Sequence, residues 1–257
     1  MSWRDSMKAA LGAAGDSWIV PDWPVPAGVR AFVTTRAGGV SEGEYASLNL
    51  GARSGDAGHN VEKNRRIVRE HLPQAPRWLA QVHGTEVAMA DDLADEANAL
   101  ADAAVARKRG RVCAVLTADC MPLFLADEWG THVAVAHAGW RGMSAGVIEN
   151  TVAAMGSPPA GLVAWMGPAI GPDAFEVGPE VREAFIAVDP ASDAAFRSHR
   201  PGKFMADLYA LARLRLARAG VREVHGGGFC TFQDAGRFFS YRREKKSGRM
   251  GAFIWME

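Results

Sequence analysis

A chain of 257 residues, 48% of them hydrophobic, is long enough to bury a substantial core. Its 29 basic and 29 acidic side chains cancel, which argues against a nucleic-acid-binding protein because such proteins usually carry a basic surplus. Three cysteines are too few for a disulfide framework, and no apolar stretch approaches the roughly 18 residues of a membrane helix. We therefore expect a cytoplasmic protein that has neither nucleic acid nor membrane as a partner.

The chain shows no sign of division into separate units. It has no internal repeat or low-complexity tract, and its proline and glycine residues are spread rather than massed at one boundary. The longest apolar run near the N-terminus, residues 9–14, is too short for the hydrophobic part of a secretory signal. We expect one domain over residues 1–257, with residues 1–20 as a loosely attached N-terminal segment.

Short apolar or alternating runs bounded by turn residues predict strands along most of the chain. These runs are residues 29–35, 78–82, 112–116, 123–126, 132–138, 162–166, 221–225 and 252–256. In the fifth run, alternation places His137 on one face with Val133 and Val135, opposite Ala134 and Ala136. A glycine-rich turn follows the first run.

Helical periodicity predicts helices between several of these strands. The segments are residues 61–72, 143–155, 179–187 and 205–219, and the apolar positions of residues 91–108 also suit helical segments. Asn60 is a plausible N-cap for the first of these helices. Strands and helices interleave irregularly, which indicates an α+β or mixed α/β fold.

Three side chains have the surroundings of metal ligands or catalytic groups. Cys120 lies in a break between two apolar runs, where a side chain can face a pocket. His137 ends a strand and precedes Gly139 and Gly142, and His83 follows a short strand and precedes Gly84. Two imidazoles and one thiolate suit a catalytic zinc site, which leaves a fourth position for water or substrate. The separations of 37 and 17 residues are not those of a zinc finger.

Other readings of the same residues stay open. Taken alone, Cys120 could be a small buried hydrophobe, and each histidine could be a hydrogen-bonded core or turn residue. Cys120 could also be a nucleophile with His137 as its base, and chelation would then spare activity. A purely structural zinc is a further alternative.

Seven motifs in order resemble those of the YfiH-like family, also called polyphenol oxidase or laccase-domain proteins and, in bacteria, peptidoglycan editing factors. The motifs are TRAGGVS at 35–41, SLNLG at 47–51, QVHG at 81–84, TADC at 117–120, AHAGWRG at 136–142, GPAIGP at 167–172 and FSYRR at 239–243. The resemblance covers the chain from about Val29 to Trp255.

This resemblance implies a fold, an activity and a site. The implied fold is a four-layer α/β/β/α sandwich, grouped with cysteine-hydrolase-like toxins. The implied metal ligands are His83, Cys120 and His137, which would hold Zn²⁺, or Cu²⁺ as the alternative. The implied activities are phosphorolysis of adenosine, inosine and methylthioadenosine, and deamination of adenosine. Phosphate is then a co-substrate, and the protein is a monomer or a small homo-oligomer.

The resemblance leaves individual roles to be argued from the residues. Zinc lowers the pKa of bound water, which suits attack on C6 of adenine. The His-x-Glu signature of zinc nucleobase deaminases is absent, and Asp119, beside Cys120, is our candidate for moving protons. Arginine suits phosphate recognition, and four arginines lie in or beside the motifs. The candidate substrate-binding residues are Arg36, Asn49, Arg65, Arg141 and Arg242.

Two rival functions follow from the family's other names. A multicopper oxidase needs several His-x-His pairs, whereas this chain has seven histidines and no such pair. One His/Cys site could bind copper but could not build a trinuclear cluster. A role in editing cell-wall precursors would instead predict binding of amino-acylated sugar nucleotides.

Overall fold

The computed structural model describes residues 3–12, 14–94 and 98–257. Its largest sheet has six strands in the order β11-β7-β5-β6-β3-β2. Neighbouring strands run antiparallel, except that β11 pairs with β7 and β2 with β3 in parallel. The strands are β2 Val87–Met89, β3 Ala103–Ala106, β5 Met121–Asp127, β6 Val133–Ala138, β7 Leu162–Met166 and β11 Glu223–Gly226.

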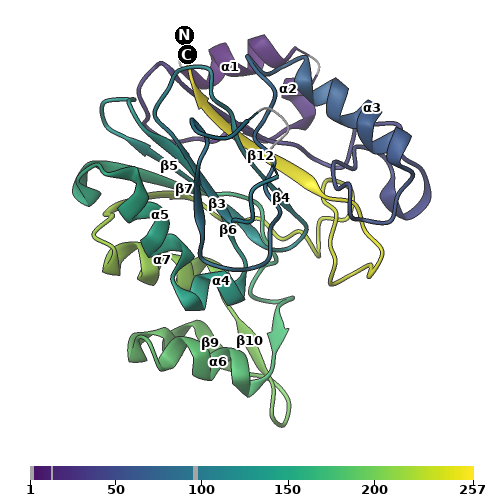
Figure 1. The fold of residues 1–257 in the computed structure, drawn as a ribbon. Coiled ribbons are helices and arrows are strands. Elements are labelled where there is room, and N and C mark those ends of the chain that lie inside the picture. The colour runs from purple at the N-terminus through teal and green to yellow at the C-terminus, as the bar shows by residue number, and fades with distance from the viewer. Residues whose placement is uncertain (1–2, 13, 95–97) are drawn as a thin grey trace.

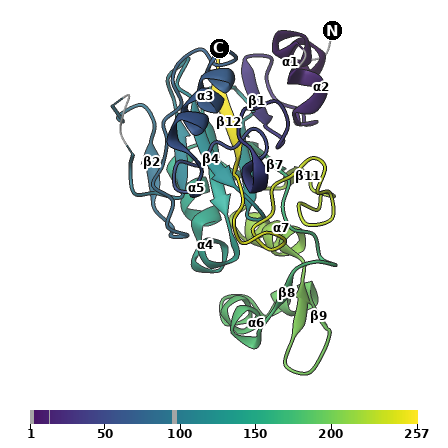
Figure 2. The same cartoon turned by 90° about the vertical axis from the view of Figure 1, so that its right-hand side faces the viewer.

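A second, three-stranded antiparallel sheet faces the first. Its order is β1-β12-β4, with β1 Val29–Val33, β12 Met250–Met256 and β4 Cys113–Thr117. A small third sheet, β8-β10-β9, lies with helix α6 away from the other two (Figure 1 and Figure 2). Its elements are β8 Glu176–Val177, α6 Pro179–Ile186, β9 Phe196–Ser198 and β10 Phe204–Ala206.

Helices cover the outer face of each large sheet (Figure 1). Beside the three-stranded sheet lie α1 Trp3–Leu11, α2 Ala14–Ser17 and α3 Gly58–Arg69; beside the six-stranded sheet lie α4 Trp140–Ala145, α5 Val147–Met155 and α7 Leu208–Arg218. The layers therefore run α/β/β/α, as the resemblance implied. Of the helices in the described ranges, none has the length and apolar character needed to cross a membrane.

Alternation along the strands creates one apolar core on each side of each sheet. In β5, Phe124 points into the core between the sheets, whereas Leu123 and Leu125 pack toward the helices. In β1, Ala31 faces the core between the sheets, and Phe32 packs with the outer helices. Because both faces of β5 are buried, its residues 121–126 form a continuous apolar run, whereas β1 is interrupted by the half-buried Arg30.

The N-terminal helix contributes to the outer core. Met7 and Leu11 of α1 are buried with Trp18, whose ring stacks on Phe32 at a centroid distance of 4.9 Å. We propose that residues 1–257 form a single domain, because the N-terminal helix shares this core with the three-stranded sheet.

The predicted helices at 143–155 and 205–219 differ from the structure. The first is two helices, α4 and α5, separated at Gly146, whose φ of 112° is left-handed. The second begins only at Leu208, because Met205 belongs to strand β10. Asp207 caps it by accepting hydrogen bonds from the backbone N–H groups of Tyr209 and Ala210.

Three further expectations were wrong. The helical reading of 91–108 fails because residues 103–106 form strand β3, while residues 95–97 lie outside the described ranges. The run 78–82 is not a strand but makes an isolated bridge at Leu79. Helix α3 begins at Gly58 after Ala57, so Asn60 lies inside its first turn and is not the N-cap.

Candidate active site

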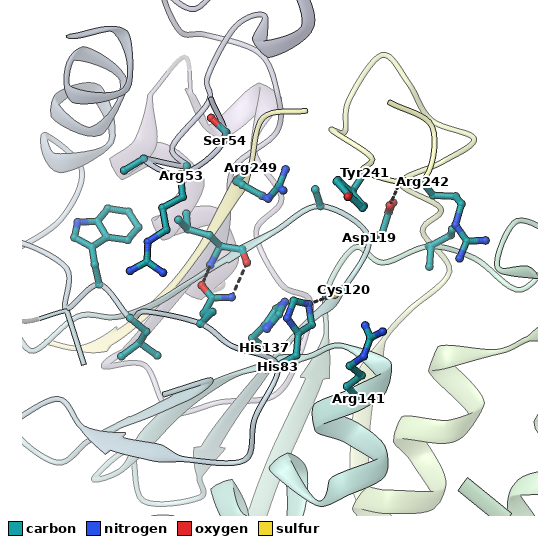
Figure 3. Close-up of a pocket in the computed structure, with 18 of the residues that line it drawn as sticks. Arg53, Ser54, His83, Asp119, Cys120, His137, Arg141, Tyr241, Arg242 and Arg249 are labelled. Atoms are coloured by element: carbon teal, nitrogen blue, oxygen red, sulfur yellow. Dashed lines mark hydrogen bonds between the residues drawn. The ribbon is translucent and has the colours of Figure 1, made fainter. Parts of the chain in front are cut away.

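Strand pairing brings the predicted ligands to one end of the six-stranded sheet. In the β5–β6 pair, Pro122 is opposite His137, so Cys120, just before β5, lies beside the end of β6. The ligand atoms of His83, Cys120 and His137 all lie within 4.8 Å of one another. The sulfur of Cys120 is 3.8 Å from His83 Nε2, and the three side chains converge in Figure 3.

A buried carboxylate that the sequence analysis missed contacts both histidines. Asp102 immediately precedes β3, which pairs with β6 and so places Asp102 beside His137. Its Oδ1 accepts hydrogen bonds from His137 Nδ1 at 2.8 Å and from His83 N–H at 2.9 Å. Its Oδ2 accepts from the N–H groups of Val82 and Gly84 at 3.0 and 2.7 Å.

The charges of the cluster depend strongly on one another. Burial alone would raise the pKa of Cys120, but the charges and hydrogen bonds of His137 and His83 lower it to about 6. Burial opposes protonation of His137, yet the Cys120 thiolate and Asp102 raise its pKa to about 9. Burial likewise opposes ionisation of Asp102, but hydrogen bonds from His137, Gly84 and Val82 lower its pKa. In the absence of a metal, these opposite shifts favour a thiolate at Cys120 beside a protonated His137.

Unusual backbone conformations and a close approach shape the cluster. His83 and Asp119 both have positive φ, at 61° and 91°, which non-glycine residues rarely adopt. A Cβ at Gly139 would lie 2.7 Å from the sulfur of Cys120 and 3.2 Å from His83 Cδ2. Position 139 is therefore next to the ligand atoms and leaves no room for a side chain.

The cluster opens into a pocket of about 820 Å³. Four aromatic residues contribute to its walls, namely Trp78, Trp140, Phe175 and Tyr241. Among the described residues that line it, Asp119 is the one carboxylate, whereas six side chains are cationic: Arg53, Arg65, Arg141, Arg242, Lys245 and Arg249. A chain with no net charge thus has a strongly cationic pocket.

The structure brings three of the five predicted substrate-binding residues into this pocket, namely Arg65, Arg141 and Arg242. Arg36 and Asn49 are not among its lining residues. Arg36 donates to the carbonyl oxygens of Ala46 and Ala235, and fully buried Asn49 accepts hydrogen bonds from the N–H groups of Gly51 and Arg249. Both side chains hold loops in place.

Asp119 lines the pocket, but its carboxylate is already engaged. Oδ1 accepts a hydrogen bond from Thr231 Oγ1 at 2.6 Å, and Oδ2 accepts one from the N–H of Arg242 at 2.7 Å. Figure 3 shows the side chain directed toward Arg242. These contacts tie the segment before Cys120 to the segments that carry Thr231 and Arg242.

The pocket also contains cations that the sequence analysis missed, namely Arg53, Lys245 and Arg249. Arg53 follows the SLNLG motif, and Arg249 directly precedes β12. Neither position has a neighbouring sequence motif that would predict a pocket residue. They enter the pocket because Asn49 holds the two segments together through the N–H of Arg249.

Comparisons with known proteins agree on one family. A purine nucleoside phosphorylase of Pseudomonas aeruginosa is 52% identical over 243 residues, covering 94% of this chain and 99% of that protein. The Escherichia coli purine nucleoside phosphorylase YfiH is 52% identical over 242 residues, covering 93% and 98%.

Solved structures show the same fold. A Neisseria meningitidis protein that is 48% identical superposes with a TM-score of 0.91, covering 94% of this chain and 99% of that one. YlmD from Geobacillus stearothermophilus, 32% identical, gives a TM-score of 0.86 over 94% and 96%. The family model described as multi-copper polyphenol oxidoreductase laccase matches residues 30–257. The chain therefore belongs to this laccase-like YfiH family.

Proposed function

We propose that this protein is a zinc-dependent purine nucleoside phosphorylase that acts on adenosine, inosine and methylthioadenosine and also deaminates adenosine. The observation that carries the proposal is a His–Cys–His cluster at the wall of a cationic pocket lined by aromatic side chains. Relatives that are 52% identical over nearly their whole length bear the name purine nucleoside phosphorylase.

The donor set of the cluster fits a catalytic metal ion. Two imidazoles and a thiolate are the ligand types of catalytic zinc sites, and the His83, Cys120 and His137 donor atoms are within 4.8 Å of one another. Copper(II) is the alternative, since it binds such donors more tightly in general. When bound, the metal supplies Lewis acidity.

Phosphorolysis requires phosphate beside C1′ of the ribose. A phosphate oxygen forms a bond to C1′, the bond from C1′ to the purine nitrogen breaks, and its electron pair leaves with the purine. Within the described part of the chain, three pocket cations have charged groups that make no hydrogen bond or ion pair, namely the side chains of Arg53, Arg141 and Lys245. We propose Arg141 as the first phosphate-binding candidate, because it lies beside the cluster in Figure 3.

The other predicted arginines are more constrained. Arg65 donates to the carbonyl oxygen of Leu50 and stacks over Trp78 at 4.1 Å. Arg242 donates to the carbonyl oxygen of Glu176 and stacks over Phe175 at 5.2 Å. We propose that these two hold aromatic walls of the pocket while adding positive charge to it.

Asp119 stays our candidate for moving protons during deamination. If it does so, Asp119→Asn should lower deamination of adenosine far more than phosphorolysis of inosine. An equal loss of both activities would instead assign Asp119 to the geometry of the Cys120 loop, which its two hydrogen bonds also support.

The proposal is tested by incubating purified metal-replete protein with adenosine, with and without phosphate, and separating the products. We expect adenine to form only with phosphate, and inosine to form without it. Chelation should abolish both products, and Cys120→Ala should do the same. The proposal fails if metal-replete protein turns over none of the three nucleosides.

One observation favours a second candidate, a cysteine hydrolase. His137 and His83 lower the pKa of Cys120 to about 6, against the desolvation that opposes it, which favours the thiolate. A thiolate beside a histidine is the arrangement of cysteine nucleophiles. This candidate predicts that chelation spares activity and that alkylation of Cys120 abolishes it.

A trinuclear copper oxidase has less support. In the described part of the chain, one cluster of His, Cys or acidic side chains could hold a metal. We propose that any oxidase activity is incidental and that purine turnover persists without oxygen. The three free cysteines are consistent with the proposed cytoplasmic location.

A further inference from the structure

We infer that Asp102 is the positioning residue of the metal site, because one carboxylate fixes both histidine ligands at once. This inference rests on the metal site of the proposed function. Asp102 does not touch the pocket that receives substrate, since it is fully buried and is not among the lining residues. Its action is through His83 and His137.

All the acceptor capacity of this carboxylate is used. A carboxylate offers about four lone-pair positions, and four donors fill them at 2.7–3.0 Å. Three of these partners are backbone N–H groups, which can only donate, so both oxygens of Asp102 act as acceptors, and His137 Nδ1 is the remaining partner at 2.8 Å. The carboxylate therefore holds the backbone N–H groups of residues 82–84 and the ring of His137 in fixed positions.

The first consequence concerns the His83 turn. The N–H groups of three consecutive residues, Val82, His83 and Gly84, converge on Asp102. These bonds hold the central residue at a φ of 61°, a conformation that costs free energy when nothing compensates it. Since Asp102 adjoins strand β3, the turn is anchored to the six-stranded sheet.

The second consequence concerns the ring of His137. With Nδ1 bonded to Asp102, Nε2 is the ring atom left to bind a metal. Buried carboxylates that hold a ligating histidine in this way fix its tautomer and raise its basicity. The backbone N–H of His137 also donates to the carbonyl oxygen of Asp102 at 2.7 Å, so side chain and backbone are held by the same residue.

The chain contains a matched control. Asp127 ends the central strand β5, at the opposite end of that strand from Cys120. It is fully buried and accepts a hydrogen bond from His132 Nδ1 at 3.0 Å. It shares the chemistry of the Asp102–His137 pair but lies outside the metal cluster. Asp127→Asn therefore shows how the loss of a buried carboxylate affects the stability of the fold when no proposed metal ligand is disturbed.

The experiment compares Asp102→Asn with Asp127→Asn. Asparagine keeps the shape of aspartate but replaces one acceptor oxygen by a donor group that faces existing donors. We expect Asp102→Asn to weaken Zn²⁺ binding by about 10–100-fold, measured by competition with a chelator. The absorption spectrum of the Co²⁺-loaded protein should change as well. Asp127→Asn should leave the Zn²⁺ affinity within about twofold of that of the unmodified protein and the Co²⁺ spectrum unchanged, even if it lowers the melting temperature.

Two outcomes would overturn the inference: Zn²⁺ affinity of Asp102→Asn within about threefold of the unmodified protein, or equal weakening by Asp127→Asn. If Asp102→Asn does not fold, nitrogen NMR of the unmodified zinc-loaded protein decides. Protonated Nδ1 in His137 supports the inference, and unprotonated Nδ1 refutes it. Neither readout depends on purine turnover. If metal binding requires Asp102 but the protein turns over no purine nucleoside, the inference stands and only the proposed function is refuted.

Discussion

At the scale of single residues, Gly139 determines how closely the chain can approach the proposed metal ligands. We expect Gly139→Ala to displace the sulfur of Cys120, because the added Cβ would lie 2.7 Å from it. Zinc affinity should fall at least tenfold. The φ of Gly139 is an ordinary −72°, so the substitution adds no backbone strain, and any fall in melting temperature reflects crowding of Cys120 and His83.

Gly58→Ala is the control for this prediction, since no atom lies within 4 Å of an added Cβ there. It should bind zinc normally. Unchanged zinc affinity in Gly139→Ala would mean that Cys120 is not a ligand in this geometry.

The ionisation of Cys120 can be measured directly in metal-free protein. Burial opposes the thiolate, but His137 and His83 lower the pKa to about 6. The thiolate should therefore persist down to about pH 6, and the rate of alkylation at Cys120, followed by peptide mass spectrometry, should have its midpoint there. An unperturbed cysteine has a pKa of about 8.5, so a midpoint near that value would contradict the arrangement. Added zinc should protect the thiol.

The three cluster residues can be predicted from the sequence, but the carboxylate that supports them cannot. Cys120 and His137 lie at strand ends, and His83 and His137 stand close to glycines. Their residue types suit zinc, so local sequence was enough to propose them even though the strand expected before His83 is absent. Asp102 lies in a segment whose periodicity favoured a helix. It reaches His137 only because β3 pairs with β6, and no local pattern reveals that contact.

At the scale of elements, the interface between the two large sheets carries much of the packing. Phe124 of β5 is fully buried there, stacked on Trp165 at 5.7 Å and near Trp23 at 6.3 Å. Phe124→Ala should lower the free energy of unfolding by about 3–5 kcal/mol in denaturant titrations, because it leaves a cavity between the sheets.

Trp129→Ala provides the comparison, since this aromatic residue is 57% exposed. Its effect should stay within about 0.5 kcal/mol. Similar losses for both variants would argue against the sheet-on-sheet core.

Strand prediction succeeded where burial on both faces produced apolar runs, as in β5, β6 and β7. It failed where tertiary contacts override local preference. Ala103–Ala106 has the composition of a helix, yet it becomes β3 because it pairs with β6 and β2 inside the sheet. Met205 similarly joins β10 rather than the helix that follows.

At the scale of the whole molecule, charge is unevenly distributed. The formal net charge is zero, yet six cationic side chains line the pocket. The KM for phosphate should therefore rise with ionic strength, because salt screens the attraction of exposed charges, whereas the KM for uncharged adenosine in deamination should change little. Equal dependence of both values on salt would contradict a phosphate site among these cations.

Arg141→Gln should raise the KM for phosphate by about tenfold or more, since a hydrogen bond to a charged group contributes about 1.5–3 kcal/mol. Arg222→Gln, at an exposed position outside the pocket, is the matched control and should leave this KM unchanged. An unaltered KM in Arg141→Gln would transfer the phosphate site to Arg53 or Lys245.

The most direct test of the central claim is metal reconstitution of chelated protein, with adenine release from adenosine and phosphate measured as zinc is added. We predict that activity returns in proportion to zinc and saturates at one ion per chain, and that Cys120→Ala neither binds this ion tightly nor regains activity. Full activity in metal-free protein, or equal recovery in Cys120→Ala, would contradict a catalytic metal at His83, Cys120 and His137.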